Sequence, residues 1–225
     1  MAALPAVVVF AREPVAGTAK TRLVPALGPE GAADLYKAFL QDRAAQVLAV
    51  EGILPVIAHT PDAAAPALAT LLPPGLRYLP QGEGDLTARL TGAAATLFDE
   101  GVSAVVFMDS DSPGLPPDRV PAAVHHLASG AADCVLGPAE DGGYYLIGLA
   151  ARAAVPAPAL FEGIPWSTPE VLALTLERAA AAGLSTHLLD PWWDVDTPAE
   201  LARLRAEPPD PDRAPRTTAW LHEHP

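Results

Sequence analysis

Short apolar runs alternate along this chain with longer stretches in which apolar residues recur every three or four positions. The short runs are typical of buried strands, and the longer spacing is typical of amphipathic helices. The first part of the chain therefore predicts strands at 6–10, 53–59, 77–79, 104–108 and 133–136, separated by helices at 31–50, 62–72, 85–100 and 118–129. Strands that alternate with helices imply an α/β fold with a mainly parallel sheet covered by helices.

The pattern changes after Gly142 and Gly143. A strand at 144–148 is followed by a connector that prolines interrupt, and then by a helix at 169–182 and a strand at 186–189. This order is compatible with a mixed sheet. There is no internal repeat, so one domain over 1–207 is the simplest organisation. The prolines that follow Glu207 predict a loosely ordered tail at 208–225.

Composition narrows the class of protein. The chain has 225 residues, half of them apolar, which is enough for a sizeable core. No apolar run approaches the ~20 residues of a transmembrane helix, and the stretch before Arg12 lacks the features of a signal peptide, so we expect a cytoplasmic protein without a membrane span. The formal net charge of −13 disfavours nucleic-acid binding, although free nucleotides accompanied by a metal stay compatible with it. A single cysteine, Cys134, excludes an internal disulfide.

The apolar run at 104–108 ends in two carboxylates, Asp109 and Asp111. In an extended segment residues two apart face the same way, so both would point just beyond the carboxyl end of a strand, where open α/β sheets bind ligands. Carboxylates this close repel one another unless a cation or protons intervene, and Mg²⁺ is held by one or two carboxylates plus substrate phosphates. The alternative is an acidic turn that caps the next helix.

The loop after the first strand is basic. It carries Arg12, Lys20 and Arg22, together with Gly17. In a parallel sheet this loop would share an edge with Asp109 and Asp111. Lysine and arginine suit phosphate oxygens, and a glycine lets backbone N–H groups come close. The loop lacks the spacing of a Walker A motif. The alternative is a solvated loop whose charges pair with nearby acids.

A second acidic pair, Asp194 and Asp196, precedes Thr197, Pro198 and Glu200, which form a helix-capping pattern. The helix dipole gives one of the two acids a structural role. The other could supply a further metal ligand opposite Asp109 and Asp111, and the pattern does not say which of the two does so.

Three further segments are candidate walls of the site. Glu140 and Asp141 precede Gly142 and Gly143, which permit either a tight hairpin turn or the close approach of a ligand. The segment Trp166, Ser167, Thr168 has the composition of a helix start, whose free N–H groups could receive an anionic acceptor. Asp85, at the start of another predicted helix, could contact a base or ribose.

Five segments, taken in order, resemble the DUF2064 family: FAREPVAGTAKTRL at 10–23, MDSDSPGL at 108–115, EDGGYYLIGL at 140–149, WST at 166–168 and DVDTP at 194–198. Such proteins are glycosyltransferase-A-like members of the nucleotide-diphospho-sugar transferase superfamily. Phospholactate guanylyltransferases and molybdenum cofactor nucleotidyltransferases share their layout. The resemblance spans about residues 6–205 and is more specific than any single motif.

The resemblance implies a Rossmann-like three-layer α/β/α sandwich with a central, mainly parallel mixed sheet. It implies a divalent metal, Mg²⁺ or Mn²⁺, on Asp109 and Asp111, with Asp194 or Asp196 as the second acidic site. Lys20 and Arg22 then fall where such enzymes hold nucleotide phosphates. The chain departs from the nucleotidyltransferase pattern because it lacks the glycine-richer G-x-G-T-R loop, which puts triphosphate binding in doubt.

Three functions stay open. In glycosyl transfer from a nucleotide-diphospho-sugar, the metal at Asp109 and Asp111 neutralises the departing nucleoside diphosphate, and an acid near Asp141 deprotonates a small acceptor. In nucleotidyl transfer from a nucleoside triphosphate, Lys20 and Arg22 stabilise charge on the phosphates. The third is a non-catalytic nucleotide-binding protein. The family resemblance favours glycosyl transfer, with Asp111, Lys20 and Asp141 as the candidate catalytic residues.

Overall fold

The computed structural model describes residues 3–154 and 157–224. Its core is one seven-stranded sheet with the order β3-β2-β1-β4-β6-β5-β7. The strands are β1 (Ala6–Arg12), β2 (Leu54–Thr60), β3 (Arg77–Pro80), β4 (Ala104–Met108), β5 (Cys134–Pro138), β6 (Tyr144–Ala150) and β7 (Thr186–Leu188). Strand β6 runs antiparallel to both of its neighbours, and the other strand pairs are parallel. The prediction of a mainly parallel mixed sheet is therefore confirmed.

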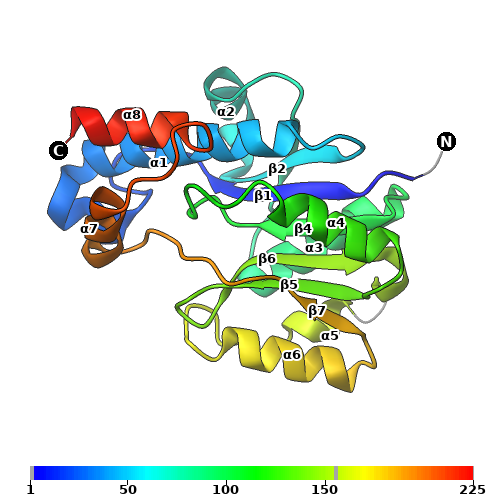
Figure 1. The fold of residues 1–225 in the computed structure, drawn as a ribbon. Coiled ribbons are helices and arrows are strands. Elements are labelled where there is room, and N and C mark those ends of the chain that lie inside the picture. The colour runs from blue at the N-terminus through cyan, green and yellow to red at the C-terminus, as the bar shows by residue number, and fades with distance from the viewer. Residues whose placement is uncertain (1–2, 155–156, 225) are drawn as a thin grey trace.

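Helices cover both faces of this sheet, which gives three layers (Figure 1). The helices are α1 (Val24–Leu48), α2 (Ala65–Leu71), α3 (Leu86–Asp99), α4 (Arg119–Ala128), α5 (Ala157–Phe161), α6 (Val171–Ala181), α7 (Pro198–Ala206) and α8 (Pro215–Glu223). Alternate residues of β1 belong to different layers: Val7 and Val9 lie in the core cluster that also contains residues of α1, α4, α7 and α8, and Val8 lies in the cluster that contains residues of α3, α5 and α6. None of the helices in the described part of the chain has the length and apolar composition that crossing a membrane requires.

The strand order reverses between β1 and β4, which lie side by side at the centre of the sheet. In open α/β sheets such a reversal creates a crevice at the carboxyl ends of the two strands, because the connections that leave them run in opposite directions. The loop that follows β1 and the loop that carries Asp109 and Asp111 meet in this crevice.

Two expectations about irregular segments were wrong. The connector before Ile164 contains a short helix, α5, whose Leu160 and Phe161 are fully buried. The segment 208–225 is not a loose tail over its described part, because α8 lies along α1 (Figure 1). Pro215 begins α8, where a missing N–H costs nothing, and the buried carboxylate of Asp42 on α1 accepts hydrogen bonds from the first N–H groups of the helix.

Candidate functional site

Two pockets open side by side in the crevice. The first, which we call the basic pocket, has a volume of about 370 Å³. It is formed mainly by the loop after β1, and its lining residues are Arg12, Thr18, Ala19, Lys20, Thr21, Arg22, Tyr36, Asp111 and Asp196. The structure therefore brings the three predicted basic residues together beside one member of each acidic pair. Gly17 turns the loop with a φ of 78° but does not line the pocket.

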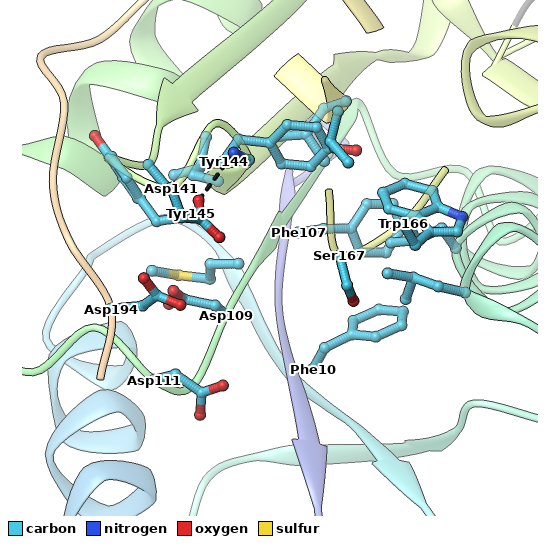
Figure 2. A pocket seen from close by; sticks show the side chains of 18 of the residues that line it. Phe10, Phe107, Asp109, Asp111, Asp141, Tyr144, Tyr145, Trp166, Ser167 and Asp194 are labelled. Carbon is cyan, nitrogen blue, oxygen red and sulfur yellow. Dashed lines mark hydrogen bonds between the residues drawn. The ribbon is translucent and has the colours of Figure 1, made fainter. Parts of the chain in front are cut away.

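The second pocket, which we call the aromatic pocket, has a volume of about 280 Å³ (Figure 2). One end is lined by apolar side chains, which include Phe10, Leu86, Leu90, Phe107, Trp166 and Val171. The other end is lined by the carboxylates of Asp109, Asp111, Asp141 and Asp194. Asp111 lines both pockets, so the two cavities meet at this residue.

Lys20 ties the two acidic pairs together. Its ammonium group lies 3.0 Å from Asp111 Oδ2, and it donates hydrogen bonds to Asp196 Oδ1 at 2.6 Å and to the Val195 carbonyl at 2.8 Å. The side chain is 5% exposed. Burial alone would lower the pKa of Lys20, but the carboxylates of Asp111 and Asp196 outweigh that effect and raise it above its usual value. Lys20 is thus a buried, charged and fully hydrogen-bonded lysine.

Backbone strain marks both pockets. Lys20 has φ 48° and Ser167, which lines the aromatic pocket, has φ 65°; no other non-glycine residue in the described ranges has a positive φ. A left-handed conformation at such residues is unfavourable and persists only where surrounding contacts enforce it, which occurs most often at functional sites. The contacts of Lys20 with Asp111 and Asp196 are of this kind.

Two buried residues of α1 support the loop that carries the acidic pair. Arg43 donates a hydrogen bond from Nη2 to the Ser112 carbonyl at 2.7 Å and lies 3.4 Å from Asp109 Oδ1. Tyr36 Oη accepts a hydrogen bond from the Arg12 N–H at 3.1 Å and pairs with Ser110 Oγ at 2.9 Å. The two residues are seven positions apart, so they lie on the same face of the helix.

Sequence reasoning missed both supporting residues. The available signal was a tyrosine and an arginine on the apolar face of the predicted helix at 31–50, where polar groups need a partner when buried. Arg43 supplies a counter-charge behind Asp109, and Ser112 Oγ donates a short hydrogen bond to the other oxygen of the same carboxylate. Arg43 and Ser112 therefore fix the position of the Asp109 carboxylate, which lines the aromatic pocket.

Asp109 and Asp194 face one another in the aromatic pocket (Figure 2). Burial raises the pKa of Asp194 to about 7, and the carboxylates of Asp196 and Asp141 add to the effect. Burial also raises the pKa of Asp109 to about 6, although Arg43 opposes the change. Carboxylates that resist ionisation because they are buried beside other carboxylates are suited to hold a cation.

This donor set fits a divalent metal that is completed by a substrate. Among the described residues, no group of three or more His, Cys, Asp or Glu side chains is arranged to hold a metal ion by itself. Mg²⁺ and similar ions usually take one or two carboxylates and fill their remaining positions with water and substrate phosphates. Asp109 and Asp194 offer two such ligands, whereas Asp196 is already neutralised by Lys20 and lies 3.4 Å from Arg22.

The second acidic pair is positioned by the start of α7. Thr197 and Glu200 form the predicted capping box, in which Glu200 accepts the Thr197 N–H at 2.6 Å. The Val195 N–H donates to the carbonyl of Asp111 at 2.9 Å, so the two acidic segments are joined through their backbones. Although Asp194 and Asp196 are two residues apart, this segment does not present them to the same side as a regular strand would: Asp194 lines the aromatic pocket and Asp196 lines the basic pocket.

The walls of the aromatic pocket partly match expectation. Asp141, Gly143, Trp166, Ser167 and Thr168 line it. Thr168 does not cap a helix, because α6 begins only at Val171 and the Thr168 hydroxyl donates to the Pro165 carbonyl instead. The turn at 140–143 and the segment before α6 pack tightly against one another, so together they form one wall.

Two predicted residues serve local structure in the observed arrangement. A Cβ at Gly142 would lie 2.3 Å from the Pro169 carbonyl oxygen, so this glycine permits the contact between the two wall segments and does not line either pocket. Asp85 caps α3 by accepting the Ala88 N–H at 2.9 Å and likewise lines neither pocket.

Comparisons with known proteins agree with this geometry. The model of a family described as "Uncharacterized protein conserved in bacteria (DUF2064)" matches residues 43–168. The crystal structure of a candidate nucleotide-diphospho-sugar transferase from Desulfovibrio desulfuricans G20 is 32% identical, with a TM-score of 0.86 over 97% of this chain and 94% of that one. No curated protein matches the chain.

More distant solved structures share the fold alone. CMP:2-keto-3-deoxy-manno-octonic acid synthetase complexed with CTP is 15% identical, with a TM-score of 0.57 over 91% of this chain and 98% of that one. Glucosyl-3-phosphoglycerate synthase from Mycobacterium tuberculosis, in complex with Mn²⁺, UDP and glucosyl-3-phosphoglycerate, is 13% identical, with a TM-score of 0.54 over 95% and 80%. The first of these structures thus contains a nucleoside triphosphate, and the second contains a nucleoside diphosphate with Mn²⁺.

Proposed function

This chain belongs to the DUF2064 family, and from that premise we propose that it is a metal-dependent glycosyltransferase that uses a nucleotide-diphospho-sugar. The observation that carries the proposal is the division of charge between the two pockets. The described residues that line the aromatic pocket include four carboxylates and no lysine, arginine or histidine, whereas the basic pocket contains three cationic side chains. Such a division suits an anionic donor and a neutral acceptor.

The donor phosphates belong in the basic pocket. The side chain of Arg22 is 63% exposed, and Arg12 is exposed at the other wall, so both can turn toward phosphate oxygens without breaking a buried contact. Lys20 forms ion pairs with Asp111 and Asp196. In this proposal it keeps those two carboxylates away from the bound phosphates and adds positive charge to the basic pocket. Nucleotide affinity therefore depends on Lys20 indirectly as well as directly.

Asp109 and Asp194, with Asp111 beside them, are the residues that would hold a divalent metal. When bound, the metal supplies positive charge that stabilises a departing diphosphate. The comparison structure with Mn²⁺ and UDP supports a divalent metal only by shared fold. Asp196 is not a ligand in this proposal, because its charge is matched by Lys20 and Arg22.

The acceptor belongs in the aromatic pocket, with its hydroxyl at the acidic end. The hydroxyl oxygen attacks the anomeric carbon, the bond from that carbon to the diphosphate oxygen breaks, and the nucleoside diphosphate leaves. Asp141 is the candidate base for the hydroxyl proton in an inverting transfer, since it is exposed and, among the described residues, its carboxylate accepts a hydrogen bond from the Gly143 N–H alone, at 2.9 Å. A phosphate or carboxylate acceptor would meet four carboxylates in this pocket.

Nucleotidyl transfer is the second candidate, and the basic pocket favours it, because Arg12, Lys20 and Arg22 could accommodate a triphosphate. In that reaction an anionic acceptor attacks the α-phosphorus and pyrophosphate leaves. The aromatic pocket argues against an anionic acceptor, which is why glycosyl transfer ranks first.

One assay separates the candidates. The protein is incubated with Mg²⁺ or Mn²⁺, a panel of nucleotide sugars or nucleoside triphosphates, and hydroxyl-bearing or phosphate-bearing acceptors. We expect release of nucleoside diphosphate with a neutral hydroxyl acceptor. Release of pyrophosphate would instead establish nucleotidyl transfer, and binding of nucleotide without either product would identify a non-catalytic nucleotide-binding protein.

A further inference from the structure

The apolar end of the aromatic pocket is larger than a sugar hydroxyl requires. Phe10 and Phe107 meet edge to face there, with ring centroids 5.4 Å apart and an interplanar angle of 89°. Leu86 is 37% exposed, and of the large apolar side chains that stay exposed in the described ranges it alone lines this pocket. Exposed apolar surface inside a concave site is typical of a ligand contact, because covering it releases water.

The wall at this end is rigid. Trp166 Nε1 donates a hydrogen bond to Thr87 Oγ1 at 2.9 Å, and Thr87 in turn donates to the Phe161 carbonyl at 2.9 Å. Tyr144 packs edge to face on the same indole at 6.3 Å. A ring that is fixed in this way loses little conformational entropy when a ligand covers it, so its apolar surface is available for binding.

We propose that the acceptor carries an uncharged aromatic or branched aliphatic group, which binds between Phe10, Leu86 and Trp166 and presents a hydroxyl to Asp141. This inference rests on the proposed function, because it takes the aromatic pocket as the acceptor side. It adds the chemical class of the acceptor: a hydroxyl compound with a small apolar group, neither phosphorylated nor a plain polar sugar.

The inference is tested by binding, without turnover. Phenyl β-D-glucopyranoside and methyl β-D-glucopyranoside share the same hydroxyls and differ in the apolar group, and calorimetry on the full chain measures the affinity of each. We expect the phenyl compound to bind about tenfold tighter, because the ring buries apolar surface that the methyl group does not reach. Glucose 1-phosphate, which is anionic, should bind the aromatic pocket more weakly than either.

Two matched variants test whether the preference for the phenyl compound arises in the aromatic pocket. Leu86→Glu adds a charge at the pocket, at the first position of α3, where an acidic residue is compatible with the helix. We expect it to remove most of the phenyl preference. Leu188→Glu makes the same change at a leucine that is 47% exposed on β7 and lines neither pocket, so the preference should stay.

The outcomes separate this inference from the proposed function. Equal binding of the two glucosides, or a phenyl preference that survives Leu86→Glu, would overturn the inference even if nucleoside diphosphate is released in the activity assay. Competition of a free nucleoside with the phenyl glucoside would also overturn it, since the donor base would then be the occupant. A phenyl preference that Leu86→Glu removes, in a protein that releases no nucleoside diphosphate, would support the pocket's ligand class and reject the proposed reaction.

Discussion

The basic pocket and the aromatic pocket share Asp111 and differ in how their charges are balanced. In the basic pocket Lys20 lies within 3.0 Å of Asp111 and 2.6 Å of Asp196, so the charges largely compensate one another within the protein. In the aromatic pocket Asp109 and Asp194 face one another with only Arg43 behind Asp109, and both carboxyl pKa values are raised. Ion pairs within the protein preorganise the basic pocket, whereas the carboxylates of the aromatic pocket are only partly balanced by nearby positive charge.

This difference indicates in which of the two pockets a bound metal would stabilise the protein more. A cation added beside Lys20 would compete with an existing ammonium group, whereas a cation at Asp109 and Asp194 relieves repulsion that folding has imposed. In the proposed reaction the same difference assigns the donor phosphates to the cations of the basic pocket and a neutral hydroxyl to the carboxylates of the aromatic pocket. Four substitutions test this difference between the two pockets.

The largest effect is expected from Asp111→Ala, because Asp111 belongs to both pockets. Loss of this carboxylate leaves Lys20 with Asp196 as its single acidic partner and removes one carboxylate beside the candidate metal ligands. We expect metal-dependent nucleotide binding to weaken by about 100-fold, at the low end of the range for loss of one partner of a buried charge pair, because Asp111 is 31% exposed. Calorimetry with Mn²⁺ and nucleotide measures it.

Asp118→Ala is the matched control for that experiment. Asp118 lies in the same loop after β4, but its side chain is 70% exposed and, within the described ranges, forms an ion pair with Arg119 alone. Its removal should leave nucleotide affinity unchanged within about twofold. Equal affinities of the two variants would contradict a role for Asp111 at the junction of the pockets.

A smaller effect is expected from Lys20→Met, which removes the ammonium group shared by Asp111 and Asp196 and leaves the exposed Arg22 as a weaker counter-charge beside Asp196. Breaking a buried pair is strongly destabilising, and since the two partners here are 31% and 39% exposed we expect a loss of about 2 kcal/mol in the free energy of unfolding. The chain has one other lysine, Lys37, which forms an exposed pair with Asp34.

Lys37→Met is therefore the control, with an expected cost below about 0.5 kcal/mol. Denaturant titration measures both variants. Nucleotide affinity should fall in the Lys20 variant by more than acceptor affinity falls, and the reverse order would move the loop after β1 to the acceptor side.

The repulsion in the aromatic pocket predicts a pH dependence. A carboxyl whose folded pKa is raised binds a proton that the unfolded chain has already lost, so its contribution to stability falls as pH rises from about 4 to the folded pKa of about 7 for Asp194. Without metal, Asp194→Asn should therefore be more stable than the wild type at pH 8, and this advantage should be clearly smaller at pH 5. Thermal unfolding at the two pH values measures the difference.

With Mg²⁺ bound, we expect the wild type, and no longer Asp194→Asn, to be the more stable of the two proteins at pH 8. Mg²⁺ is expected to raise the melting temperature of the wild type more at pH 8 than at pH 5, because it replaces protons that the carboxyls lose in between, and to have little effect on Asp194→Asn. Asp118→Asn should behave like the wild type. A pH-independent Mg²⁺ response that survives in Asp194→Asn would remove Asp194 from the candidate metal ligands.

The smallest effect on stability is expected from Arg22→Ala. Its side chain is 63% exposed, and the ion pair that it forms in the described structure is a 3.4 Å contact with Asp196. The free energy of unfolding should therefore change by less than about 0.5 kcal/mol. Nucleotide affinity should still fall by about tenfold if Arg22 contacts phosphate, and the loss should shrink at high salt. Unchanged affinity would limit the phosphate contacts to Arg12 and Lys20.

Patterns local to the sequence were sufficient to predict the fold and the edge of the sheet at which the site lies. The apolar run before Asp109 forms β4 at the centre of the sheet, and the capping box at Thr197 and Glu200 forms as expected just after the second acidic pair. These features depend on neighbours in the chain, which periodicity and capping rules describe.

The division of the acidic residues between two pockets could not be predicted, because it depends on contacts across the whole chain. Lys20 and Asp196 are 176 positions apart, and Arg43 reaches Asp109 over 66 positions. The helical tail was missed for a related reason: α8 forms because Asp42 caps it and α1 covers it, and neither contact is visible in a proline-rich segment.

A crystal structure of the chain with Mn²⁺ and a nucleoside diphosphate tests whether the site has a donor side and an acceptor side. We expect the phosphates within hydrogen-bonding distance of Arg12 or Arg22 in the basic pocket, the metal on Asp109 and Asp194, and the apolar end of the aromatic pocket free of nucleotide. A base or ribose seated between Phe10 and Trp166, or a metal bound by Asp196 in place of Lys20, would contradict the division of the site into a donor side and an acceptor side.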